Sequence, residues 1–192
     1  RLMSAFLIPT EPAGDFSWYF DRANELANDL GYQQDGAPTS FWPPGYPFAL
    51  SLAVRLFGHS VLAGMLLNAV LGTLICLLTY EVARRIMTET RARIAGLLVA
   101  LFPSQILSTN LLGTEILFTA LLFLLLYLLL ARPASRHDYG YVAIIGVTVG
   151  LASYVKVLVI LTPLVIFVWW LLAGVGLKRA TGSLAVVFLS SL

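Results

Sequence analysis

The sequence predicts an all-α protein, a polytopic transmembrane helical bundle that follows an extracytoplasmic loop carrying an amphipathic interfacial helix. Of the 192 residues, 59% are hydrophobic and 11% are charged, whereas a soluble domain has roughly 25% charged residues. The apolar stretches at 60–80, 94–131 and 141–177 are each long enough for one or two membrane passes of about 20 residues. These passes must be helical, because backbone polar groups in lipid need partners within the chain.

The charges are sorted along the chain, and this sorting predicts the topology. Residues 1–45 contain six carboxylates and two arginines, a net charge of −4, whereas residues 46–192 have a net charge of +6. The basic residues at 84–93, 132–136 and 178–179 form short loops that the positive-inside rule places in the cytoplasm. Each interval between them suits two passes, and residues 60–83 suit one. We therefore expect an outer loop at 1–58 and transmembrane helices at 59–192.

The two ends of the sequence suggest how this chain relates to the whole protein. The chain begins without an initiator Met, and "SLAVVFLSSL" stops within another apolar segment. We expect it to be an internal piece of a longer, multi-pass protein of the cell (inner) membrane, with its active site on the periplasmic or equivalent side.

The acidic segment "GDFSWYFDRANELANDLGY" is typical of an amphipathic helix, with Asp15 suited to the N-cap and Gly31 to the position after the C-terminus. Its apolar residues fall on one face at helical spacing: Phe16, Tyr19, Phe20, Ala23, Leu26, Ala27 and Leu30. We expect this face to lie in the membrane interface. The carboxylates of Asp21, Glu25 and Asp29 line the opposite, solvated face. Asp15 is either a helix cap or a carboxylate at the lipid–water boundary, where partial burial would suit it to general-base catalysis.

The stretch "PPGYP" at 43–47 predicts a rigid turn before a short helix over 48–57. Two prolines fix an extended approach, Gly45 permits a bend, and Pro47 suits the first helical position. The helix is too short to span a membrane, so we expect it to be interfacial or re-entrant, with the turn held over an outer cavity. The alternative is an ordinary helix entry.

Two charged residues are expected at outer turns of the bundle. Glu115 follows the turn residues 108–110 and Gly113, and Lys156 lies in a second turn between 153 and 163. An ionisable residue at such a position is a functional candidate, although Glu115 could instead form a buried pair with Lys156 or Arg55. Both cations suit a lipid phosphate.

We expect Pro44 and Tyr46 of the rigid turn to line the same substrate site, together with Tyr19, Arg55 and Lys156. The sequence has no nucleotide-binding loop and no hydrolase motif, and we expect no nucleic-acid partner.

In order along the chain, "GDFSWYFDRANELANDLGY", "PTSFWPPGYPFALSLAVRLFGHS", "LVALFPSQILSTNLLGTEILFTALLFLLLYLL" and "GVTVGLASYVK" resemble the GT-C membrane glycosyltransferases. The likeness is to the bacterial family 39, or protein mannosyltransferase-like, enzymes. It implies a GT-C-like bundle that transfers a sugar, usually with inversion, from a polyprenyl-phosphate donor to an extracytoplasmic acceptor such as a protein, lipid or glycan.

The resemblance also implies roles for particular residues. Asp15 matches the functional carboxylate of the first outer loop, as general base or acceptor-positioning group, and Tyr19 belongs to the same motif. Glu115 matches the carboxylate of the second outer loop, and Lys156 matches a basic residue near the donor phosphate. A divalent metal ion stays open as a cofactor, but Phe16 stands where many relatives have a second acid.

A different class of function is also open. A non-catalytic flippase or transporter of lipid-linked saccharides would place charges near the bilayer midplane and show internal repeats. Here the expected polar groups gather at the outer face and the sequence shows no repeat, which favours the transferase.

Overall fold

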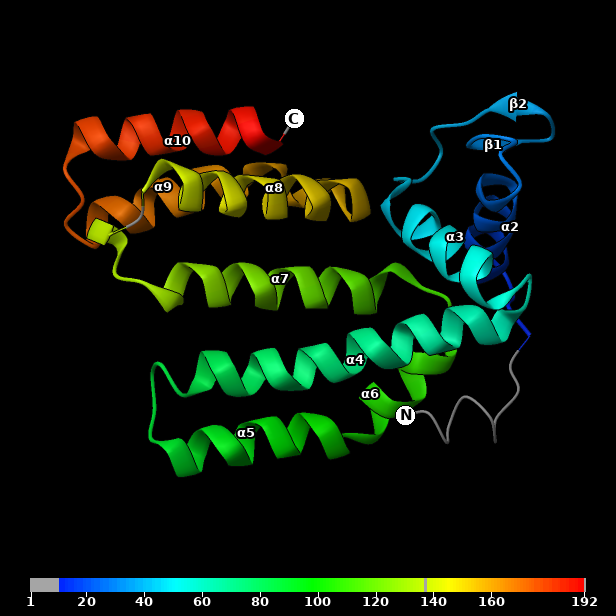
Figure 1. Cartoon of the computed structure of the whole chain (residues 1–192), viewed down its shortest axis with the longest axis horizontal. Helices are drawn as coiled ribbons and strands as arrows, with labels where there is room; N and C mark the ends of the chain where they lie inside the picture. The colour runs from blue at the N-terminus through cyan, green and yellow to red at the C-terminus, as the bar shows by residue number, and fades with distance from the viewer. Residues whose placement is uncertain (1–10, 137, 192) are drawn as a thin grey trace.

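The computed structural model describes residues 11–136 and 138–191, and it confirms the all-α prediction (Figure 1). The main helices are α2 (Asp15–Ala27), α3 (Gly45–Phe57), α4 (Val61–Ala83), α5 (Glu89–Leu101), α7 (Thr114–Ala131), α8 (Tyr139–Val155), α9 (Thr162–Leu172) and α10 (Leu177–Ser191). Short elements join them: strands β1 (Gln33–Gln34) and β2 (Ala37–Pro38), helix α6 (Pro103–Leu107), and the 3₁₀ turns η1 (Ser108–Asn110), η2 (Ala134–Arg136) and η3 (Val157–Leu161).

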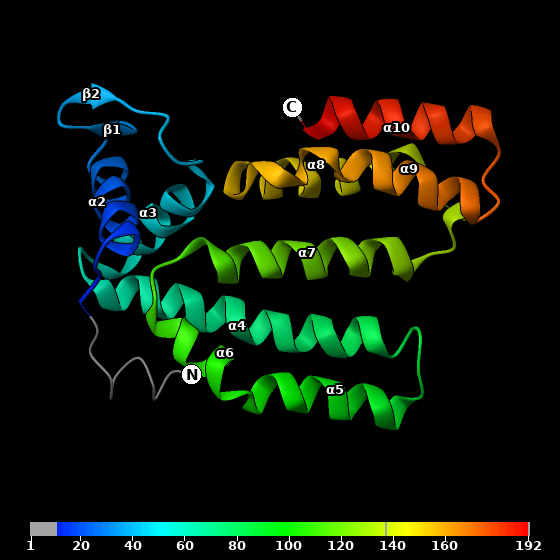
Figure 2. The same ribbon diagram turned by 180° about the vertical axis from the view of Figure 1, so that it is seen from behind.

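The helices from α4 onward form a stack in which successive long helices of the chain run in opposite directions, whereas the packed neighbours α4 and α7 run in the same direction (Figures 1 and 2). Helix α5 packs on α4, α4 on α7, α7 on α8, and α10 on both α8 and α9. The basic loops after α4 and α7 lie at one end of the stack, together with the loop after α9 and the basic first turn of α10, and α2, α3 and the hairpin form a lobe at the other end. We call these the inner and outer ends. Their assignment to the two sides of a membrane stays a prediction.

The described residues contain two helices long and apolar enough to cross a membrane, α4 and α7. Helix α5 and the following residues 103–110 pass the same test together, but they bend by 54° at their break. Helix α8 has 17 residues, a length of about 25 Å, and is short for a bilayer core of about 30 Å.

Two glycines of α8 set its packing against α10. A Cβ at Gly146 would lie 2.7 Å from the carbonyl oxygen of Val187, and one at Gly150 would lie 2.6 Å from that of Ser191. Only glycine permits this approach, since real Cβ contacts are not that short. The apolar core beside it includes the buried side chains of Ile145 and Trp170.

Helix α2 differs from its predicted boundaries at both ends. Gly14, with φ of 59°, is the N-cap, so Asp15 is the first helical residue and not the cap. At the other end, the N–H of Asp29 bonds to the Leu26 carbonyl and the N–H of Leu30 bonds to the Glu25 carbonyl. Asp29 adopts the left-handed conformation, so this Schellman closure ends the helix before Gly31.

The apolar face of α2 packs against α3 over part of its length. Tyr19 and Ala23 are buried in a cluster with Tyr46 and Leu50 of α3, whereas Leu30, expected on the same face, is 59% exposed. The helix is amphipathic as predicted, but its partner is another segment of the chain.

Helix α3 begins earlier than predicted, because Pro44 is the N-cap and Gly45 the first helical residue. Pro47 is therefore the third residue of the helix, where its missing N–H is still tolerated. The expected role of Gly45 in a bend is also wrong. A Cβ there would lie 2.6 Å from the carbonyl oxygen of Tyr154, so Gly45 permits close packing of α3 against the end of α8.

Strands β1 and β2 form a small antiparallel hairpin in which Gln34 pairs with Ala37. Asp35 and Gly36 make its turn, with φ of 52° and 79°, the positive values that a two-residue hairpin turn favours. The hairpin stands beside α2 at the outer end (Figure 2).

Candidate active site

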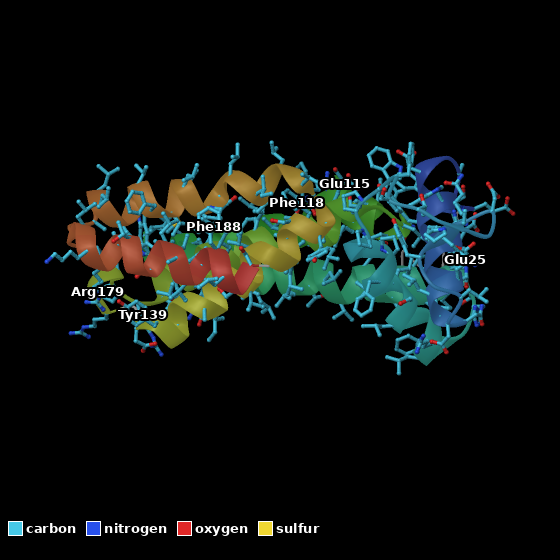
Figure 3. The ribbon with its side chains drawn as sticks, turned by 90° about the horizontal axis from the view of Figure 1, so that it is seen from above. Glu25, Glu115, Phe118, Tyr139, Arg179 and Phe188 are labelled. Carbon is cyan, nitrogen blue, oxygen red and sulfur yellow. The ribbon has the colours of Figure 1, made fainter. Side chains whose placement is uncertain are left out.

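An ion pair joins two helices at the outer end of the stack. Lys156, the C-cap residue of α8, places its Nζ 3.0 Å from Oε1 of Glu115 in the first turn of α7. The side chains are 38% and 66% exposed, respectively, so the pair is accessible and not buried. In Figure 3, Glu115 and Phe118 lie toward the lobe, whereas Tyr139 and Arg179 lie at the inner end.

The start of α2 lies close to the same pair. A Cβ on Gly113 would lie 2.5 Å from Oε2 of Glu115 and 3.1 Å from the ring of Phe16, so the carboxylate and this ring flank one glycine. Asp15 directly precedes Phe16. The fold therefore brings the first turn of α2 to the first turn of α7.

Asp15 is exposed in the first turn of α2, which differs from the partial burial expected for it. Four residues later, Tyr19 is 7% exposed. Burial raises the pKa of Tyr19, and the charges of Asp15 and Glu115 raise it further, while a hydrogen bond with Thr114 opposes them. The Tyr19 phenol therefore stays neutral beside the charges of Asp15 and Glu115.

Tyr46 is fully buried, unlike a residue that lines a substrate site. Its hydroxyl donates to Oδ1 of Asn68, 3.2 Å away, and Nδ2 of Asn68 donates to the Leu111 carbonyl at 2.7 Å. Tyr46 thus holds α3 against α4 and the segment before α7. Sequence reasoning missed Asn68, although a lone amide in an apolar helix is a signal for such a network.

Arg55 is not part of the group formed by Asp15, Glu115 and Lys156. Its guanidinium donates to the carboxylate of Asp29 and to the carbonyl of Leu26, at the end of α2. It lies ten residues after Gly45, about 15 Å along the helix. Its role here is to tie α3 to α2.

Two cavities lie at the outer end of the bundle and share Pro44 and Tyr154 as lining residues. The first, about 640 Å³, lies between the segment 39–44 and the outer ends of α8 and α10. The second, about 480 Å³, lies between α3 and helices α7 and α8, and its lining is almost wholly apolar. Of the substrate-binding residues predicted from the turn, Pro44 lines both cavities.

The spacing of the His, Cys, Asp and Glu side chains bears on whether they form a metal-ligand cluster. Within the ranges 11–136 and 138–191, no group of three or more His, Cys, Asp or Glu side chains gathers as metal ligands would. Phe16, beside Asp15, offers no ligand atom.

Comparison with protein families provides the identification. Residues 42–191 match the model of the family described as dolichyl-phosphate-mannose-protein mannosyltransferase. Comparisons with curated proteins and with solved structures gave no significant match. The family match covers most of the chain, including α3 with its rigid turn, Glu115 and Lys156. The chain therefore belongs to the dolichyl-phosphate-mannose-protein mannosyltransferase family, and it is a membrane glycosyltransferase of the mannosyltransferase type.

Proposed function

We propose that this protein transfers a sugar from a polyprenyl-phosphate donor to an acceptor outside the cytoplasm, with its active site at the outer end of the bundle. The observation that supports the proposal is the ion pair of Glu115 and Lys156 beside an apolar cavity, with the ring of Phe16, the residue after Asp15, packed near Gly113 at the start of α7. Lys156 pairs with Glu115 at 3.0 Å, and Val155, the preceding residue, lines the cavity.

The apolar chain and the phosphate of the donor would bind at different places, the cavity and Lys156. Its isoprenoid chain would occupy the apolar cavity of about 480 Å³, where Phe48, Leu52 and Leu121 are among the lining residues. Its phosphate would lie at Lys156. An ammonium group has three N–H donors, so Lys156 can bind Glu115 and a phosphate oxygen together, and Glu115 would orient it.

Asp15 would act as the general base. Its carboxylate takes the proton from the acceptor hydroxyl as that oxygen attacks the anomeric carbon of the donor sugar. The bond from this carbon to the phosphate oxygen breaks, its electron pair leaves with the phosphate, and attack from the opposite face inverts the configuration. The charge of Lys156 stabilises the leaving phosphate. No step passes through a metal ion.

The test is a transfer assay on membranes that contain the full-length protein and a radiolabelled polyprenyl-phosphate sugar. We expect the wild type to move label into non-carrier material, and Asp15→Asn to lose at least about 10²-fold in rate, the usual contribution of a general base. Asp21→Asn is the matched control, because it removes an exposed carboxylate from the same helix. We expect it to leave the rate unchanged.

Two results would count against the proposal. Full activity of Asp15→Asn, at normal expression, would show that Asp15 is not the general base. Label that crosses the bilayer but stays on its carrier, equally in wild type and variant, would identify a transporter of lipid-linked saccharides instead.

A further inference from the structure

The larger cavity, of about 640 Å³, has a lining unlike that of the apolar cavity. It falls in the range of about 300–1,000 Å³ that small-molecule sites occupy. Among its described lining residues none is charged, and several carry hydroxyl groups, including Thr39, Ser40 and Ser153. This chemistry suits a neutral molecule with both polar and apolar surface.

Aromatic rings form one wall of the cavity. Phe41 and Trp42 line it, with ring centroids 5.2 Å apart in an edge-to-face arrangement. Phe41 is 70% exposed, so its ring is available to a ligand. The C–H face of a pyranose ring packs well on such an aromatic surface, and its hydroxyl groups suit the serines and threonines of the rim.

The wall is fixed to α2 from behind. Trp18 packs against Tyr32 at 5.8 Å and against Phe41 at 6.2 Å, and the Tyr32 hydroxyl donates to the Trp42 carbonyl at 2.8 Å. Arg22 lies 5.4 Å from the Trp18 ring and is itself held by two hydrogen bonds to Glu25. The rings are therefore positioned before any ligand arrives, which reduces the entropy lost on binding.

The cavity also lies beside the proposed catalytic groups. Ser153, Tyr154 and Val157 line it on either side of Lys156 in the sequence, and Trp18 lies one turn after Asp15 on α2. An occupant would thus lie at the same end of the bundle as Lys156, against a wall that packs on α2.

We propose that this cavity is a saccharide-binding subsite, which takes a neutral pyranose ring against Phe41 and Trp42. The inference rests on the proposed function for its place in the reaction. The ring belongs either to the sugar of the donor or to a glycan acceptor, and both offer the same chemistry to the wall.

Binding is measured without any transfer step, so that failure of the proposed function and failure of this subsite give different results. The full-length protein in lipid nanodiscs is titrated with methyl α-mannopyranoside, and saturation transfer from protein to sugar is followed by NMR. Phe41→Ala should weaken binding by about two- to tenfold, the range expected for one aromatic contact, and Phe41→Tyr should restore it. Phe57→Ala is the matched control, because Phe57 is an exposed ring on α3 (61%, against 70% for Phe41) that lines neither cavity.

The binding assay tests the subsite, and the transfer assay tests the proposed function. Sugar binding lost in Phe41→Ala supports the subsite, even if Asp15→Asn retains transfer activity. In the transfer assay, a raised KM for the donor assigns the ring to the donor sugar, and a raised KM for the acceptor assigns it to the acceptor. The proposal is overturned if the sugar shows no saturation transfer, if Phe41→Ala binds as the wild type does, or if farnesol displaces the sugar from the wall.

Discussion

The two ends of the bundle use charge differently. In the described residues of the inner end, each ion pair joins residues no more than six apart: Arg84 and Arg85 with Glu81, Arg93 with Glu89, and Arg132 with Asp138. The outer end has one such local pair, Arg22 with Glu25. It also has two long-range pairs, in which Lys156 pairs with Glu115 from 41 residues away and Arg55 with Asp29 from 26 residues away.

This difference separates charges that set topology from charges that build a site. An ion pair within one helix forms without help from the neighbouring helices. A basic residue in such a pair can therefore act as a topology signal independently of how the helices pack. A pair between distant segments exists only when the fold has brought them together. The two long-range outer pairs therefore report the assembled structure, and Lys156 lies in the chain between Val155, which lines one cavity, and Val157, which lines the other.

The largest expected effect comes from removing the charge of Lys156. We expect Lys156→Met to lower the transfer rate by roughly 10²–10³-fold, the typical loss when one electrostatic group of an active site is removed. Stability should change little, because Glu115 is 66% exposed and water can solvate its unpaired carboxylate. Rate and thermal unfolding are measured on the same preparation.

Arg93→Met provides the comparison for Lys156→Met, because it breaks an exposed pair within α5. We expect normal transfer from it. An equal loss of rate in both variants would mean that charge at either end supports activity indirectly, and the distinction between the ends would fail.

The next effect concerns the packing that holds the outer lobe to the bundle. Gly45→Ala places a Cβ 2.6 Å from the backbone carbonyl oxygen of Tyr154. Helix α3 or helix α8 would have to shift to relieve this contact. We expect destabilisation of about 1–3 kcal/mol, as for other overpacked sites, measured as a lower midpoint of thermal unfolding.

The control for Gly45→Ala is Gly176→Ala, where a new Cβ meets nothing within 4 Å. It should leave the midpoint unchanged. If both variants unfold at the wild-type midpoint, the lobe is free to shift on α8, and the site would not depend on this contact.

The sequence was sufficient for features that depend on composition or local pattern. The apolar helices, the outer turn before Thr114 and the position of Lys156 after α8 all follow from runs of hydropathy and from polar breaks. The hairpin turn had a local signal as well, since Asp35-Gly36 is a preferred two-residue turn, although sequence reasoning did not use it.

Features that depend on long-range packing were harder to predict. Helical periodicity indicates that α2 has an apolar face. It cannot tell whether that face contacts lipid or packs against another helix such as α3. For the same reason Tyr46 looked like a site residue, although it is a buried partner of Asn68. The aromatic wall around Phe41 combines α2 with a loop more than twenty residues away, and no single motif contains it.

The smallest expected effect is that of the second outer pair, which has no catalytic neighbour. Arg55→Ala removes contacts to Asp29 and to the Leu26 carbonyl, but the arginine and aspartate side chains are 46% and 83% exposed. Such pairs contribute about 0.2–1 kcal/mol, and salt screens them. The difference in unfolding midpoint between wild type and Arg55→Ala should therefore shrink when the salt concentration is raised, while transfer stays at the wild-type rate.

A difference in unfolding midpoint that persists in high salt would assign the contribution of Arg55 to packing of its aliphatic stem. A loss of transfer comparable to that of Lys156→Met would place Arg55 in the phosphate site, and the distinction between structural and catalytic pairs at the outer end would have to be abandoned.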